Sequence, residues 1–108
     1  MQRFKPDFIA MVTYALPGQG GRSTPVHSGY QPVIRFDGTG YATKAENVLT
    51  DREQLYLGET AEVNITMISI ELPDNSLLVG QRFDIYEPPR LVGSGIIKQI
   101  VNKNLEKE

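Results

Sequence analysis

Glycine and proline recur at short intervals along this chain, and their spacing constrains the fold more than any other feature. The 108 residues include 10 glycines and 7 prolines, which interrupt the chain too often for a long helix. No apolar repeat with the helical period extends beyond one or two turns, whereas several segments alternate with the period of a strand. The sequence therefore predicts an all-β fold of short strands and frequent turns.

Six segments have the composition of β-strands. In order, they are residues 4–14, 28–36, 41–48, 60–72, 81–86 and 91–101. Asp37-Gly-Thr-Gly40 fits a hairpin turn of type I′ between the second and third segments. In the fourth segment the alternation changes phase at Met67–Ile68, which predicts a bulge or a bend there. Six short strands favour a small closed antiparallel barrel over an open sheet, because closure removes exposed edges.

Four local features carry further expectations. Neither face of the first segment is plainly polar, so we expect partial burial on both sides. Residues 51–56 are polar and fit one helical turn. Gly93 and Gly95 stand two residues apart, so they share a face that a backbone or a large ring can approach closely. Residues 102–108 are charged and lack an apolar anchor, so we expect one barrel domain over residues 1–101 and a frayed tail.

Composition and charge exclude several classes of protein. The chain contains no cysteine, which excludes disulfides, thiolate nucleophiles and cysteine-based metal sites. The formal net charge of −2 argues against a basic nucleic-acid-binding domain. The first residues lack the pattern of a signal peptide, and no apolar run reaches the roughly 20 residues of a membrane span. We therefore expect a cytoplasmic protein that does not associate with a membrane.

The residue types that catalysis or metal binding requires are sparse. His27 is the only histidine, and its sequence neighbours Ser23, Thr24 and Ser28 lie on the same loop, which seldom yields an oriented triad. The carboxylates are scattered, so we expect no metal site and no cofactor. Residues 18–22 lack the lysine and hydroxyl with which a phosphate-binding loop ends. The sequence predicts a protein that is not an enzyme.

Three stretches resemble one protein family in order and spacing. Gly20-Gly-Arg-Ser-Thr-Pro25, followed by Gly29-Tyr-Gln-Pro32, resembles the motif GGRxTP…GYRP. Gly80-Gln-Arg-Phe-Asp-Ile85 resembles GxRFxI, and Arg90-Leu-Val-Gly-Ser-Gly-Ile-Ile97 resembles RTVGxGVV. The resemblance spans nearly the whole chain. The chain is thus similar to the third, C-terminal domain of translation elongation factor Tu, which is a six-stranded antiparallel barrel.

The resemblance implies contacts with both RNA and protein. In that family this domain contacts the T-stem of aminoacyl-tRNA, packs on the GTPase domain and meets the nucleotide-exchange factor. Arg22 and Glu87 match the family's loop arginine and its acidic residue before the last turn. Ser23 stands in place of a histidine, Ser69 lies near the position of a phosphate-contacting lysine, and residues 88–89 are prolines in place of glycines. These changes weaken the implied RNA surface.

We therefore expect a binding module whose leading partner is a protein, namely a translation GTPase or a ribosome-associated factor. The candidate residues for contact with a protein or RNA partner are Arg22, Ser23, Thr24, Tyr30, Glu87 and Arg90. For Arg22 the structural alternative is an arginine that closes the loop or packs on Tyr30.

Two other functions stay open. The first is binding of tRNA or another RNA, as in the family. The second is self-association into a homo-oligomer, because the face that neighbouring domains cover in elongation factor Tu would be exposed in a single barrel.

Overall fold

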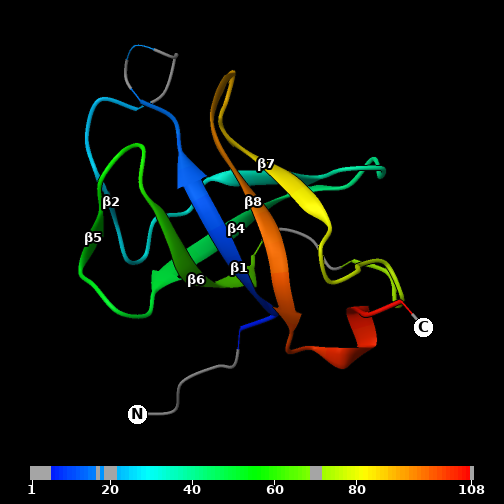
Figure 1. Cartoon of the computed structure of the whole chain (residues 1–108). Coiled ribbons are helices and arrows are strands. Elements are labelled where there is room, and N and C mark those ends of the chain that lie inside the picture. The colour runs from blue at the N-terminus through cyan, green and yellow to red at the C-terminus, as the bar shows by residue number, and fades with distance from the viewer. Residues whose placement is uncertain (1–5, 17, 19–21, 69–71, 108) are drawn as a thin grey trace.

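Six antiparallel strands form a closed barrel in the computed structural model, which describes residues 6–16, 18, 22–68 and 72–107. The barrel strands are β1 (Phe8–Tyr14), β3 (Val33–Phe36), β4 (Ala42–Leu49), β6 (Thr60–Met67), β7 (Arg82–Glu87) and β8 (Arg90–Ile100). Their order around the barrel is β1-β6-β4-β3-β7-β8, and β8 pairs with β1 to close it (Figure 1). The fold class predicted from the sequence is confirmed.

The antiparallel strands give the barrel two ends with different connections. The β7–β8 hairpin lies at one end with the last residue of β1, and we call this the hairpin end (Figure 1). The first residue of β1, the last residue of β8 and the 3-10 helix η2 (Lys103–Leu105) lie at the other, which we call the helix end. A separate two-stranded sheet pairs β2 (Val26–His27) with β5 (Gln54–Leu55).

Three phenylalanines from different strands pack together inside the barrel. Phe8 of β1, Phe36 of β3 and Phe83 of β7 are each at most 1% exposed. Their rings meet edge to face, with centroid distances of 5.8 Å from Phe8 to each of the other two and 6.0 Å between Phe36 and Phe83. Each buried ring contributes roughly 2 kcal/mol from the area it removes from water, so the three are a large part of what holds the strands together.

Strand β1 is fully buried on its inward face and partly buried on its outward face. Phe8, Ala10, Val12 and Tyr14 are fully buried, whereas Met11 on the other face is 36% exposed. The expectation of partial burial on both faces therefore holds for the outward face, where Ile9 and Thr13 are half-buried, and is wrong for the inward face, which is fully buried. The barrel surrounds its interior completely, so the inward phase of the strand is dry while the outward phase faces solvent.

Gly93 and Gly95 of β8 leave room for the two kinds of neighbour that their spacing predicts. A Cβ at Gly93 would lie 2.7 Å from the backbone oxygen of Thr13, and one at Gly95 would lie 2.4 Å from the Cζ atom of Phe83. Neither position has space for a larger residue. The approach of a backbone and of a ring is confirmed.

The fourth predicted strand is shorter than its sequence pattern indicates. Strand β6 ends at Met67, and Ile68 is 49% exposed outside it. The phase change therefore marks the end of the strand rather than a bulge within it, and residues 69–71 lie outside the described residues. The register shifts occur along β8 instead, where Ile9 pairs with Gln99 and Ala10 with Ile97.

The predicted turn between β3 and β4 is present, but it is not of type I′. The amide of Thr39 donates to the carbonyl of Phe36 over 3.3 Å, which makes Asp37 and Gly38 the central pair. Type I′ requires a positive φ at both central residues, and only Gly38 has one, at 78°.

Residues 51–56 do not form the helical turn that their polarity favours. Gln54 and Leu55 form β5, where Leu55 pairs with Val26. Leu55 is fully buried and Val26 is 1% exposed. Burial of this apolar pair against the barrel outweighs the weak local preference for a helical turn.

The C-terminal segment is packed rather than frayed as far as residue 107. Leu105 is only 5% exposed and supplies the apolar anchor that the expectation overlooked. The amide of Leu77 donates to the carbonyl of Leu105 over 2.8 Å, and the amide of Lys107 donates to the carbonyl of Leu77 over 2.7 Å. The domain therefore extends past residue 101, because an anchor and a backbone ladder fix the segment.

Replacing Gly95 with alanine tests the packing at the barrel centre. We expect Gly95→Ala to lower the free energy of unfolding by about 1–3 kcal/mol, because Phe83 is held by two other rings and cannot move away. Chemical denaturation measures the change. Gly40→Ala is the matched control, since a Cβ there meets nothing within 4 Å, and its effect should stay within about 0.5 kcal/mol. Equal effects of the two substitutions would contradict the packing argument.

Candidate functional site

Three of the residues singled out in the sequence lie together at the hairpin end. Arg22 precedes β2, Tyr30 forms an isolated antiparallel bridge with Asn47 of β4, and Glu87 is the last residue of β7. The Oε2 atom of Glu87 accepts hydrogen bonds from the Nη1 group of Arg22 and from the hydroxyl of Tyr30. We call Arg22, Tyr30 and Glu87 the hairpin-end cluster.

Arg22 uses all three of its side-chain nitrogens inside the protein. Beyond the ion pair with Glu87, its Nε donates to the carbonyl of Thr24 over 3.2 Å, and its Nη2 donates to the Thr24 hydroxyl over 3.1 Å. The guanidinium also lies 4.5 Å from the centroid of the Tyr30 ring, a cation–π contact. Arg22 thus packs on Tyr30, as the structural alternative for this residue predicts. It also joins the loop that contains it to the β7–β8 hairpin.

The cluster perturbs the acidity of its members. Burial acts against the charged form of Glu87, but the hydrogen bonds from Tyr30 and Arg22 and the positive charges of Arg22 and Arg90 outweigh it. The pKa of Glu87 is therefore held below its usual value. Burial, together with the hydrogen bond to Glu87, raises the pKa of Tyr30 above its usual value. Near neutral pH the cluster contains a charged pair and a neutral phenol.

A buried polar contact beneath the cluster supports it. Tyr14 and Asn47 are both fully buried, and the Tyr14 hydroxyl donates to Asn47 Oδ1 over 3.2 Å. The amide group of Asn47 donates in turn to the carbonyl of Ala45 over 3.2 Å. The Tyr14 ring meets Tyr30 edge to face at 5.8 Å. Sequence reasoning missed Asn47, whose only signal is an amide at an inward position of a strand.

The other candidate residues surround the cluster on the surface. Ser23, Thr24 and Arg90 are exposed, as are the two prolines at 88–89. Arg90 opens β8 and pairs with Glu87 in the hairpin register. The loop before β2 and the tip of the β7–β8 hairpin therefore present exposed residues next to a cluster that holds these two segments together.

Among the described residues, no side-chain hydrogen bond joins His27 to Ser23, Thr24 or Ser28. His27 is exposed in β2 opposite Gln54, while the Ser28 hydroxyl accepts a hydrogen bond from the amide of Leu49 over 2.9 Å. Within the described ranges, no three histidine or acidic side chains gather where they could hold a metal ion. The described part of the chain also contains no helix long and apolar enough to cross a membrane. Ser69 lies outside the described residues.

No protein-family model matches the sequence. The barrel and its strand order are observed, and the resemblance to the third domain of elongation factor Tu stays a hypothesis that rests on the three sequence motifs. The geometry of the hairpin end is therefore the basis on which a function is argued below.

The depressed pKa of Glu87 predicts a pH-dependent contribution to stability. We expect Glu87→Gln to lower the free energy of unfolding by about 1–2 kcal/mol near pH 7, because it removes the charge that pairs with Arg22. A carboxyl with a depressed folded-state pKa stabilises the fold above its unfolded value near 4.3 and loses that contribution as pH falls below it. The difference from the unmodified protein should therefore shrink below about pH 4.

Denaturation curves across this pH range measure the difference. Glu53→Gln makes the same chemical change at an exposed residue and should alter stability little. A Glu87→Gln effect that stays constant down to low pH would show that the ion pair is not its source.

Proposed function

We propose that this chain is a protein-binding module rather than an enzyme, and that its hairpin end is the contact surface. The observation that carries the proposal is the hairpin-end cluster, in which Arg22 joins the loop before β2 to Glu87 of the β7–β8 hairpin. The exposed residues Ser23, Thr24 and Arg90 are thereby displayed on two segments that are fixed relative to each other. Loops positioned by a rigid scaffold are a common location of binding residues.

A fixed surface suits binding for a thermodynamic reason. Immobilising a flexible side chain on binding costs roughly 0.5–1.5 kcal/mol, and loops that must become ordered add to that cost. Here the side chain of Arg22 is already held by three residues, and its exposed fraction is 18%. A partner that docks on this end therefore binds a surface that is already ordered in the folded protein, so binding does not incur this entropic cost.

The same contacts favour a protein partner over RNA. RNA binding draws most of its affinity from cations that reach phosphates and release counterions. The charge of Arg22 is balanced by Glu87, and its nitrogens donate to Glu87, Thr24 and Pro25. An arginine engaged in this way offers little to a phosphate. The resemblance to elongation factor Tu supports a translation GTPase or a ribosome-associated factor as the partner, in the cytoplasm.

A pull-down from lysate tests the surface and the class of partner together. We expect the tagged chain to capture a protein that resists RNase treatment, and Arg90→Ala to reduce its affinity for that protein severalfold. Arg35→Ala is the matched control, because Arg35 is an exposed arginine on β3 near the turn at the helix end. Its affinity should equal that of the unmodified chain, measured by calorimetry with the purified partner.

Two outcomes would contradict this proposal. Capture of RNA that RNase abolishes, with an affinity that falls steeply as salt rises, would assign the RNA function instead. An equal loss of affinity in Arg90→Ala and Arg35→Ala would show that the hairpin end is not the contact surface.

Self-association is a second candidate function, and an apolar patch on the outer face of the barrel favours it. Met11 of β1 and Ile96 of β8 stand directly opposite each other in the strand register and are 36% and 49% exposed. Adjacent exposed apolar side chains are a feature of surfaces that associate.

Sedimentation velocity tests this second candidate. If the chain forms a dimer through this face, Ile96→Lys should shift it to monomer by placing a charge in the contact. Ile68→Lys is the matched control, because Ile68 has the same exposed fraction of 49% and lies outside the barrel strands. A chain that sediments as a monomer at high concentration would rule self-association out.

A further inference from the structure

The turn between β3 and β4 presents an aspartate followed by a glycine to solvent. The side chain of Asp37 is 52% exposed, and its one ion pair to a described residue is a long contact of 3.9 Å with the Nε atom of Arg82. A Cβ built at Gly38 would meet nothing within 4 Å. Water therefore reaches both residues, and the Asp37 side chain has room to rotate. The turn lies away from the hairpin-end cluster, so this inference does not rest on the proposed function.

The amide of Gly38 lies between two backbone amides that are both bonded. The amide of Asp37 donates to the carbonyl of Arg82 over 2.9 Å, and that of Thr39 donates to the carbonyl of Phe36 over 3.3 Å. No described residue accepts a hydrogen bond from the amide of Gly38, which is exposed. Most backbone amides are held by a partner. This nitrogen can instead approach the carboxyl group of the preceding residue without breaking a hydrogen bond of its own.

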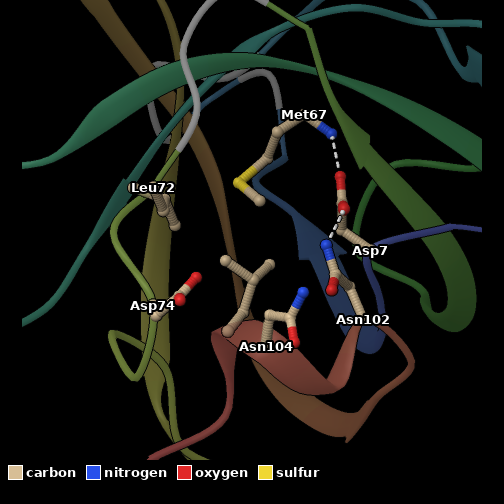
Figure 2. Close-up of a pocket in the computed structure, with 7 residues that line it drawn as sticks. Asp7, Met67, Leu72, Asp74, Asn102 and Asn104 are labelled. Atoms are coloured by element: carbon tan, nitrogen blue, oxygen red, sulfur yellow. Dashed lines mark hydrogen bonds between the residues drawn. The ribbon is translucent and has the colours of Figure 1, made fainter.

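The other aspartates of the chain do not combine these features. Asp7, Asp51, Asp74 and Asp84 are each followed by a residue with a side chain, namely phenylalanine, arginine, asparagine and isoleucine. Asp7 and Asp74 line a hollow at the helix end (Figure 2). There Asp7 accepts hydrogen bonds from the amide of Met67 over 2.8 Å and from the side chain of Asn102 over 3.2 Å. The amide that follows Asp74 is that of Asn75, and it donates to the carbonyl of Asn104 over 2.9 Å.

We propose that Asp37 is a modification site at which the folded protein rearranges spontaneously to isoaspartate. The nitrogen of Gly38 attacks Cγ of Asp37 and forms a new bond to it, while the amide proton and the carboxyl hydroxyl leave together as water. The product is a five-membered succinimide ring. Water then opens this ring by cleaving the bond between the Gly38 nitrogen and one of the two carbonyl carbons. Cleavage at Cγ restores aspartate, and cleavage at the backbone carbon leaves the chain linked through the side chain. One water molecule leaves and one enters, so the reaction needs no other reactant.

The rearrangement changes the turn in two ways. It adds one carbon to the main chain between the Cα atom of Asp37 and Gly38, and it converts the backbone carbonyl of Asp37 into a free carboxylate. That carbonyl accepts a hydrogen bond from Nε2 of Gln81 over 2.9 Å, which joins the turn to the residue before β7. The amide of Phe36 donates to the carbonyl of Tyr41 over 3.3 Å across the turn. A longer turn cannot keep both bonds as they are, so this part of the β3–β4 hairpin changes as the molecule ages.

The hydrogen bond from Gln81 slows the reaction in the folded chain. Ring closure rotates the peptide group between Asp37 and Gly38, and this rotation breaks the bond that Gln81 donates. The net contribution of one such bond corresponds to about a fivefold change in rate. We therefore expect the folded chain to isomerise about fivefold more slowly than a synthetic peptide of residues 36–44, in which Gln81 is absent.

Peptide mapping of the aged full chain tests the site. Trypsin cleaves after Arg35 and Lys44, so residues 36–44 form one peptide that contains Asp37, no other aspartate and no asparagine. After incubation for several weeks at neutral pH and physiological temperature, we expect a second peptide of the same mass that an endoproteinase specific for aspartate does not cleave. Absence of this product while the synthetic peptide isomerises would overturn the proposal, as would equal conversion at Asp74.

Two glutamine variants test whether the fold controls the reaction. Gln81→Ala removes the hydrogen bond to Asp37 and should raise the rate about fivefold, to that of the synthetic peptide. Gln99→Ala replaces an exposed glutamine of β8 that has no hydrogen bond to the turn, and it should leave the rate unchanged. The amide NMR spectrum of each variant reports whether it is folded. Equal rates in the two variants would overturn the role of this hydrogen bond.

NMR of the aged chain tests the structural consequence. We expect a second set of amide peaks from Thr39, Tyr41 and Gln81, in the proportion of isomerised peptide that mapping finds. The amides of the hairpin-end cluster should keep a single set. A sample that contains isoaspartate but shows unchanged amides at Thr39 and Tyr41 would overturn the inferred change in the turn.

Discussion

The packing of three phenylalanine rings inside the barrel constrains how the six strands close. A barrel of six strands has a narrow interior that side chains must fill. Phe8, Phe36 and Phe83 fill it with edge-to-face contacts between 5.8 and 6.0 Å. Such an interior leaves no space for a fourth large group, which is why β8 passes the Phe83 ring with a glycine. The register shifts along β8, the longest strand, let it bend around that packing.

The polar cluster at the hairpin end depends on this packing through β1. Tyr14 has the same inward phase as Phe8, so the strand that brings one ring to the centre brings the other under Tyr30. The contact of Tyr14 with Asn47 satisfies the polar groups that this burial creates. Tyr30 then supports the guanidinium of Arg22. This group contacts Glu87, although Arg22 and Glu87 are 65 positions apart in the sequence. The loop arrangement is therefore a consequence of core packing and not of the loop sequence alone.

The sequence could predict what repeats locally and could not predict what depends on distant partners. Alternating apolar residues predicted the barrel strands, and the Asp37–Gly38 pair predicted a turn. The spacing of Gly93 and Gly95 indicated the close approach of a backbone or a ring. The sequence did not predict strand β5 or the packing of the C-terminal segment, and the reason is similar for both. Leu55 follows the polar residues 51–54 and Leu105 stands among polar residues, and the partners that bury them come from distant segments. In the candidate site, Arg22, Tyr30 and Glu87 were each named, but the hydrogen bonds that Glu87 accepts from both of the others follow only from the fold.

Charged side chains are paired at one end of the barrel and not at the other, and this difference bears on what each end can bind. At the hairpin end Glu87 and Arg22 neutralise each other and the exposed Arg90 adds a positive charge beside them, so a partner is recognised by that charge and by the shape of the surface. At the helix end Asp74 has no ionic partner among the described residues and stands beside nearly buried leucines. Asp74 is exposed, so water solvates its carboxylate. One packed interior thus supports a rigid surface with a paired arginine and glutamate at one end and a hollow whose described lining includes two carboxylates at the other.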